Sequence, residues 1–96
     1  GASKAALESI VRHLALELGP RGVRVNAISA GVVDTDALKH FPNRQDLIDA
    51  AERRTPAGRL VEPTDVADAV LFLVSPLARM VMGHTLLVDG GYSIMG

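Results

Sequence analysis

The sequence contains no cysteine and no tryptophan, and its only aromatic residues are Phe41, Phe72 and Tyr92. Without cysteine there is neither a disulfide framework nor a thiolate metal site, which fits a reducing compartment, and we expect a cytoplasmic protein. Because aromatic residues are so scarce, the apolar fraction of 48% must build its core from Leu, Val, Ile and Ala. Cores of this kind are typical of α/β proteins.

Strong charge and long apolar runs are missing as well. The formal net charge of −1 provides no basic surface for nucleic acid or for an anionic membrane. No apolar run approaches the ~18 residues of a membrane span, and the N-terminus lacks the pattern of a signal peptide. We therefore expect neither nucleic acid nor a membrane as a partner. Because the chain does not start with Met, we expect a longer gene product.

Metal ligands are also lacking. The three histidines, His13, His40 and His84, do not show metal-ligand spacing, so no metal site is expected. We interpret His13 and His84 as surface or structural residues. A substrate contact by His40 is a weaker alternative, because this residue lies in a polar segment.

The N-terminal part of the chain predicts a helix followed by a strand. Apolar residues recur at helical spacing over Ala2–Leu18, which predicts a helix. Its expected buried stripe consists of Leu7, Ile10, Val11, Leu14 and Leu18. Gly19-Pro20 would end the helix, because Gly suits a C-terminal cap and Pro cannot continue it. The β-branched and apolar residues of Val23–Ser29 then predict a strand after a short loop.

The end of this strand is the first candidate site. The strand pattern stops at Gly31, where a glycine permits a sharp turn or the close approach of a ligand. Asp34 and Thr35 place polar groups just beyond the carboxyl end of the strand. Ligands of open α/β sheets bind at that end.

The stretch from residue 34 to residue 59 differs from the rest in being polar and often interrupted. It predicts a short helical turn over Asp36–Phe41 and a helix over Arg44–Arg53 that Asn43 caps. We expect it to be a lid or binding loop rather than a core layer. Arg53, Arg54 and Arg59 form a small basic group on it.

The C-terminal part predicts another helix and strand. Pro63 opens the helix with Asp65 in its first turn, and Ser75-Pro76 ends it. Its expected buried face consists of Val66, Ala69, Val70, Leu73 and Val74. A short apolar run over His84–Asp89 predicts the second strand, which Gly90-Gly91 ends. Two parallel strands and their helices cover little surface, so the sequence is typical of the end of a larger parallel sheet.

Three segments resemble the short-chain dehydrogenase/reductase family. Gly1–Glu8 resembles the helix that carries the family's active-site lysine. The nicotinamide-side strand and loop resemble Val25–Gly31 together with Thr35, and the last strand resembles Val88–Gly91. The segments occur in the family's order and span the whole chain. The resemblance implies an α/β fold in which residues 1–96 are the C-terminal part of one doubly wound, Rossmann-like domain, without its N-terminal cofactor-binding part.

Within the family, the enoyl-acyl-carrier-protein reductases are the most similar. Ser29-Ala30-Gly31 stands where generic members have Pro-Gly, and Asp34–Arg44 is similar to the NADPH-dependent branch of some bacteria. The resemblance implies reduction of trans-2-enoyl thioesters in fatty acid synthesis, with NADP(H) favoured over NAD(H). It also implies acyl-carrier protein or an acyl thioester as partner, and a homotetramer. A 3-oxoacyl reductase or another alcohol dehydrogenase of the family stays open, as does a non-catalytic fragment.

The resemblance also assigns roles to individual residues. The catalytic tyrosine would precede Gly1, and Lys4 would favour its ionised form and bind the nicotinamide ribose; the alternative is a solvated lysine. Gly31, Val33 and Thr35 match the loop that the family folds against the nicotinamide, with the Thr35 hydroxyl meeting the carboxamide or the pyrophosphate; the alternative is a strand-ending turn. Asn26 matches a structural asparagine. The residues that choose between NADH and NADPH follow an earlier strand of the family's sheet. The basic group could meet an acidic acyl-carrier protein.

Overall fold

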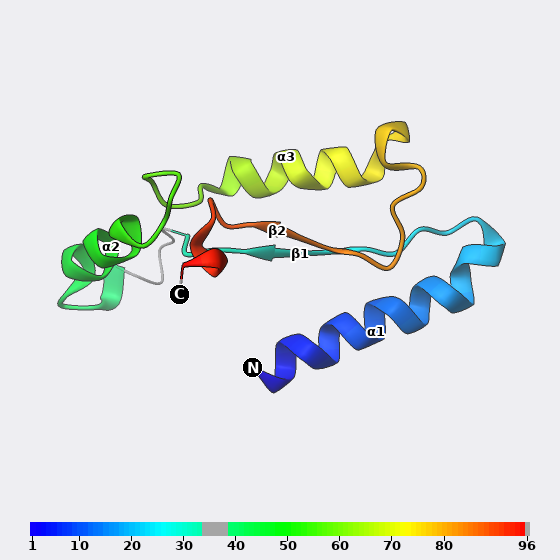
Figure 1. Cartoon of the computed structure of the whole chain (residues 1–96), viewed down its shortest axis with the longest axis horizontal. Helices are drawn as coiled ribbons and strands as arrows, with labels where there is room; N and C mark the ends of the chain where they lie inside the picture. The colour runs from blue at the N-terminus through cyan, green and yellow to red at the C-terminus, as the bar shows by residue number, and fades with distance from the viewer. Residues whose placement is uncertain (34–38, 96) are drawn as a thin grey trace. The chain divides into compact units, whose positions relative to one another are not determined.

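The computed structural model describes residues 1–33 and 39–95 and has the predicted α/β architecture (Figure 1). Its helices and strands are, in order, α1 (Ala2–Leu18), β1 (Ala27–Ala30), α2 (Arg44–Arg53), α3 (Pro63–Val74) and β2 (Thr85–Val88). The chain divides into two compact units. The first comprises Gly1–Ile28 and Asp68–Leu86, and the second comprises Ser29–Ala67 and Leu87–Gly96. None of the helices in the described residues is long and apolar enough to span a membrane.

The two strands lie side by side as a parallel pair (Figure 1). The backbone N–H of Ala27 donates to the carbonyl of His84 at 2.9 Å, and that of Gly31 donates to Val88 at 3.0 Å. From the first bond to the second, the donor moves forward from Ala27 to Gly31 and the acceptor moves forward from His84 to Val88. The two strands therefore run in the same direction. Parallel strands joined through a helix are the predicted arrangement.

Strand β1 begins later than the predicted Val23, because a side chain replaces part of the backbone ladder. The Asn26 amide nitrogen donates to the carbonyl of Val81 at 2.9 Å, and its oxygen accepts the N–H of His84 at 3.0 Å. Both polar atoms of this part-buried amide are thus paired, as burial requires. These bonds agree with the structural role expected of Asn26.

The predicted bounds of α1 are confirmed, and Gly19 is its C-cap residue as predicted, but the cap is not the usual left-handed one. Gly19 keeps a right-handed φ of −53°, and the chain tightens into a 3₁₀ turn over Gly19–Arg21. The left-handed residue is Gly22, with φ of 81°, and its N–H donates to the carbonyl of Gly19. A 3₁₀ extension followed by a left-handed glycine satisfies the last carbonyls as a simple cap would.

The buried face of α1 is only partly the predicted stripe. Val11 and Ala15 are buried, whereas Leu7, Ile10 and Leu14 remain 51%, 53% and 38% exposed. The small Ala15 side chain allows the segment before β2 to approach: a Cβ placed on Gly83 would lie 3.4 Å from that of Ala15. In the described residues, α1 therefore packs through its small side chains and leaves larger ones exposed.

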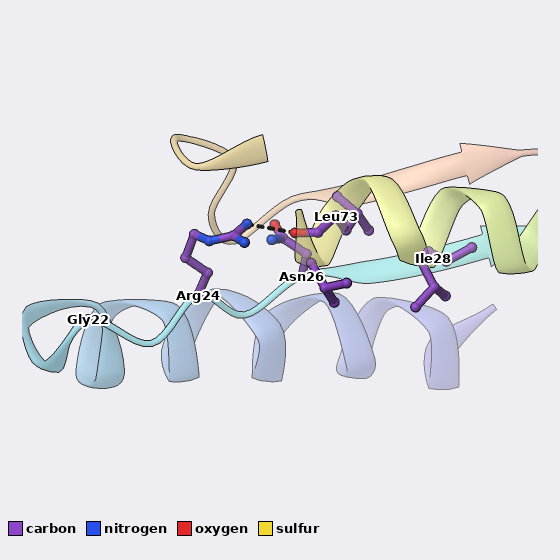
Figure 2. A pocket seen from close by; sticks show the side chains of 7 residues that line it. Gly22, Arg24, Asn26, Ile28 and Leu73 are labelled. Carbon is purple, nitrogen blue, oxygen red and sulfur yellow. Dashed lines mark hydrogen bonds between the residues drawn. The ribbon is translucent and has the colours of Figure 1, made fainter. Parts of the chain in front are cut away.

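The C-terminal end of α3 is held by Arg24 (Figure 2). Its guanidinium donates to the carbonyls of Leu73 at 2.7 Å and Ala78 at 2.8 Å. Helix C-termini carry carbonyls without helical partners and favour a cation. Leu73 is buried as predicted, but Val70 and Val74 are 44% and 69% exposed, so that part of the predicted buried face is wrong.

The second unit has a small core of its own. Ile48, Ala51 and Leu60 are buried together, with Val32 packed against them. Two of these residues come from α2, so the expectation that this polar stretch contributes no core is wrong. The bounds of α2 are as predicted, although the Asn43 side chain makes no capping hydrogen bond. Residues 36–38 of the turn predicted over Asp36–Phe41 lie outside the described residues.

Candidate functional site

The candidate site starts at Gly31, which directly follows β1. A Cβ at this position would lie 2.9 Å from both the Cα and the Cβ of Asp89. Such a separation is shorter than carbon atoms tolerate, so the close pairing of the two strand ends requires glycine here. The structure therefore supplies a packing reason for Gly31 that the sequence motif does not reveal.

The backbone of the loop after Gly31 is held by a separate segment. The N–H of Val61 donates to the carbonyl of Val32 at 3.1 Å, and Val33 forms a parallel bridge with Val61. Val61 is buried, being only 5% exposed. Gly31 and Val33, two of the predicted nicotinamide-binding residues, thus lie in one backbone-fixed loop. The third, Thr35, lies outside the described residues.

The end of β2 contacts the segment that follows α2. Gly90 and Gly91 both have positive φ, 61° and 93°. A Cβ on Gly90 would lie 2.8 Å from the Thr55 methyl carbon, and one on Gly91 would lie 2.9 Å from Pro56. The N–H of Ala57 donates to the carbonyl of Gly90 at 2.9 Å. The two glycines thus end the strand, as predicted, and also receive the chain leaving α2.

Asp89 closes the turn after β2. Its carboxylate accepts the backbone N–H groups of Gly91 at 2.9 Å and Ser93 at 3.1 Å. Hydrogen bonds from Ser93 and then from Gly91 lower the pKa of Asp89, because they stabilise the ionised form. Asp89 is therefore a structural carboxylate, and its charge is used to hold the turn.

The predicted catalytic lysine, Lys4, lies in the first turn of α1 with an exposed side chain. It belongs to the first compact unit, whereas Gly31 and Val33 belong to the second. A cation in the first turn of a helix is disfavoured by the helix dipole, and that turn contains no acidic residue. Helix stability therefore gives no reason for a lysine at this position.

Two of the three arginines in the predicted basic group have partners within the second unit. The Arg54 guanidinium lies over the Tyr92 ring, 5.6 Å from its centroid, which is within cation–π range. Arg59 forms an ion pair with Asp65, which lowers the pKa of Asp65 to about 2, mainly through the hydrogen bond between the two side chains. The group is therefore less available to an acidic partner than the sequence indicates.

The histidines are exposed, as expected for His13 and His84, and His40 is exposed too. Among the described residues, no group of three or more His, Asp or Glu side chains could hold a metal ion. The role of Arg24 was not predicted from the sequence. Arg24 lies two positions before Asn26, so both polar side chains fall on one side of an otherwise apolar extended segment. That alternation was the available signal.

A family model described as enoyl-(acyl carrier protein) reductase matches residues 1–93. The chain is 45% identical over 93 residues to galactitol 2-dehydrogenase (L-tagatose-forming) of Cereibacter sphaeroides. It is 43% identical over 96 residues to the enoyl-acyl-carrier-protein reductase (NADH) FabI of Bacillus cereus, and 45% identical over 94 residues to L-rhamnose 1-dehydrogenase (NAD(P)(+)) of Azotobacter vinelandii. The three alignments cover 97%, 100% and 93% of this chain, in that order. They cover only 37%, 38% and 35% of the length of the three relatives.

Solved structures agree on the fold. A short chain dehydrogenase family protein from Francisella tularensis superposes with a TM-score of 0.86 at 29% identity, over 97% of this chain and 42% of that one. A putative 2-deoxy-D-gluconate 3-dehydrogenase from Agrobacterium tumefaciens, with bound NADP, gives a TM-score of 0.82 at 36% identity, over 97% of this chain and 38% of that one.

The names of the relatives correct the expected cofactor. The similar enoyl reductases of Bacillus cereus, Synechocystis and Nostoc are all named for NADH, so the expectation of NADP(H) over NAD(H) is wrong. That expectation came from the loop Asp34–Arg44. The physical reason for the error is that a 2′-phosphate is read by residues after an earlier strand of the family's sheet, not by a loop beside the nicotinamide.

Proposed function

Because this chain belongs to the short-chain dehydrogenase/reductase family, we propose that it forms the C-terminal part of a nicotinamide-dependent oxidoreductase. The observation that carries this proposal is the loop Gly31–Val33, whose backbone is fixed on both sides at the carboxyl end of β1. Ligands of doubly wound sheets bind at this end. A rigid loop there suits a flat ring that must be held in one orientation.

The reaction that we propose is the reduction of a trans-2-enoyl thioester, such as enoyl-acyl-carrier protein, in fatty acid synthesis. Support comes from the matching family description, from the NADH-named enoyl reductases among the relatives, and from Ser29-Ala30-Gly31 at the end of β1. Bound NADH would supply a hydride to the β-carbon. The electron pair of the carbon–carbon double bond would then shift toward the thioester oxygen, and the α-carbon would take up a proton.

The residues of this chain would position the cofactor and favour ionisation of the catalytic tyrosine. The Lys4 ammonium would donate hydrogen bonds to the nicotinamide ribose and favour ionisation of a tyrosine that precedes Gly1 in the whole protein. Its exposed side chain, on a helix turn without acidic residues, fits that role. Backbone groups at Val33 would meet the carboxamide, and the hydroxyl of Thr35 would meet the carboxamide or the pyrophosphate. In the described part, Gly31 contributes by letting Asp89 approach.

A second candidate is a sugar or polyol dehydrogenase of the same family. The identities of 45% to the galactitol and L-rhamnose dehydrogenases favour it as strongly as those to the enoyl reductases favour the first. The roles proposed for Lys4 and for the Gly31–Val33 loop would each serve both reactions, because hydride transfer uses the same end of the cofactor. The substrate and the direction of hydride transfer would differ.

The experiment is a substrate comparison with the full-length protein. NADH oxidation is measured with crotonyl and acetoacetyl thioesters, and NAD⁺ reduction with galactitol and L-rhamnose. We expect the crotonyl thioester to give the highest kcat/KM. A higher kcat/KM with acetoacetyl thioester would identify a 3-oxoacyl reductase, and one with a sugar would identify the second candidate. Either result would reject the enoyl reductase assignment.

We also propose a homotetramer. The exposed side chains of Leu7, Ile10 and Leu14 line one side of α1, and an apolar helix face of this kind is suited to burial against another copy. Sedimentation of the full-length protein tests the oligomeric state, and a monomer would reject the proposal.

A further inference from the structure

Arg59 and Asp65 close the turn that leads into α3. Two parallel hydrogen bonds join them, from Arg59 Nη1 to Asp65 Oδ2 at 2.7 Å and from Nη2 to Oδ1 at 3.1 Å. Arg59 Nη1 also donates to the carbonyl of Leu60 at 3.0 Å. Asp65 Oδ2 also accepts the N–H of Glu62 at 2.8 Å. A bidentate, charge-assisted pair fixes direction as well as distance.

The turn closed by this pair carries the segment that holds the candidate nicotinamide loop. Leu60 is 8% exposed and belongs to the core cluster with Val32 packed against it. Val61 bonds to the carbonyl of Val32 at 3.1 Å and bridges Val33. A chain of contacts therefore leads from the ion pair, through two buried residues, to the backbone of the loop.

We propose that the Arg59–Asp65 pair is a positioning device that fixes the nicotinamide-binding loop through Val61. The proposal rests on the proposed function, since Val33 meets the nicotinamide only if the protein binds that cofactor. Arg59 and Asp65 do not touch the cofactor. They act by restricting Leu60 and Val61 to the position in which the Val32–Val33 backbone is held.

An ordinary helix cap would explain Asp65 but not Arg59. Capping needs only the bond from the N–H of Glu62, the residue before α3, back to the Asp65 carboxylate. Loss of that bond would weaken α3 without a selective effect on either end of a bound dinucleotide. A positioning pair has a different signature. Its loss weakens contacts at the nicotinamide end and leaves contacts at the adenosine end unchanged.

The experiment compares the binding of NADH and of ADP-ribose, which lacks the nicotinamide, to the full-length protein by calorimetry. The variants are Arg59→Gln, which keeps the capping carboxylate, and Asp65→Asn, which keeps an oxygen for the Glu62 N–H. We expect the Kd of NADH to rise roughly threefold to fivefold, as for loss of a partly exposed ion pair, and that of ADP-ribose to stay unchanged. Asp68→Asn, an exposed carboxylate of the same helix, is the matched control and should affect neither ligand.

Each outcome of the NADH and ADP-ribose titrations either supports the proposal or overturns it. Selective loss of NADH affinity in Arg59→Gln supports the proposal. Equal losses for both ligands, or no loss for either, would overturn it in favour of a purely structural pair. If Asp65→Asn does not fold, Arg59→Gln alone gives the answer. Failure of the unsubstituted protein to bind NADH while it binds another substrate class would instead reject the proposed function.

Discussion

Replacing Gly31 with alanine tests whether this glycine serves the pairing of β1 and β2. The added methyl carbon would lie 2.9 Å from the Asp89 Cα and 3.3 Å from its carbonyl oxygen. Nonbonded carbon atoms prefer separations of about 3.5–4.0 Å. Because the nearest atom belongs to the backbone, it cannot rotate away as the end of a flexible side chain would. The two strand ends must therefore separate.

The cost follows from two contributions. Overpacking of a close contact costs about 1–3 kcal/mol. Separation of the strands also lengthens the hydrogen bond from the Gly31 N–H to Val88, now 3.0 Å, whose net value is about 0.5–1.5 kcal/mol. We expect Gly31→Ala to lower the free energy of unfolding by about 2–4 kcal/mol, a large share of the ~5–15 kcal/mol of an ordinary domain.

The assay is urea unfolding of the full-length protein without cofactor, so that any effect on binding is kept out of the measurement. Gly58→Asn is the control: Gly58 has a φ of +82° and open space where a Cβ would lie, and asparagine tolerates this conformation. We expect the control to lose about 1 kcal/mol, the cost of a left-handed backbone at a residue with a side chain, and therefore less than Gly31→Ala. If Gly31→Ala were equally mild, the packing explanation would be refuted.

Three further predictions concern other parts of the chain. In the full-length protein, Lys4→Ala should remove most of the turnover while the melting temperature stays the same, because an exposed lysine contributes little to packing; near-normal turnover would reject the role of Lys4. The pKa of Asp65 is lowered from 3.8 to about 2, so its contribution to stability is complete above pH 3.8 and is lost as the pH falls through about 2; urea unfolding at several acidic pH values should show a shallower acid-induced loss for Asp65→Asn, and an unchanged profile would contradict this. Residues 1–96 alone should neither bind a nicotinamide cofactor nor form a stable monomer, because exposed side chains such as Leu16 and Val74 (77% and 69%) lack packing partners; light scattering and a cofactor titration check this, and a monodisperse monomer with a cooperative transition would contradict it.

Helical periodicity and terminal residues predicted the elements well, because both depend on local interactions. The bounds of α1, α2 and α3 agree with the prediction. The choice of buried face did not follow in the same way. Helix α1 has apolar residues around more than one side, and period alone does not tell which side meets a neighbour. In the structure, Val11 and Ala15 are buried while Ile10 is exposed, because the chain before β2 approaches the side with the smaller residue.

Contacts between distant residues were the least predictable feature. Arg24 and Asn26 bind carbonyls of Leu73 and Val81, which lie 49 and 55 positions away. No local pattern specifies such partners. What the sequence does contain is a pair of polar residues two positions apart in an apolar extended segment. Burial of polar side chains obliges them to find partners, so the existence of distant partners was predictable even though their identity was not.

The candidate site shows the same limit in a form that bears on function. A loop that binds through its backbone, as we propose here, does not need its own side chains to touch the ligand, so Val33 carries little sequence signal of binding. The constraints fall instead on the residues that hold the backbone in place: Gly31, which lets Asp89 approach, and Val61, which bonds to Val32. Motif reasoning assigned Gly31 to the cofactor, whereas its geometry assigns it to the sheet. Both assignments place rigidity at the same loop, and the supporting residues are therefore where substitutions should reveal the function of the loop.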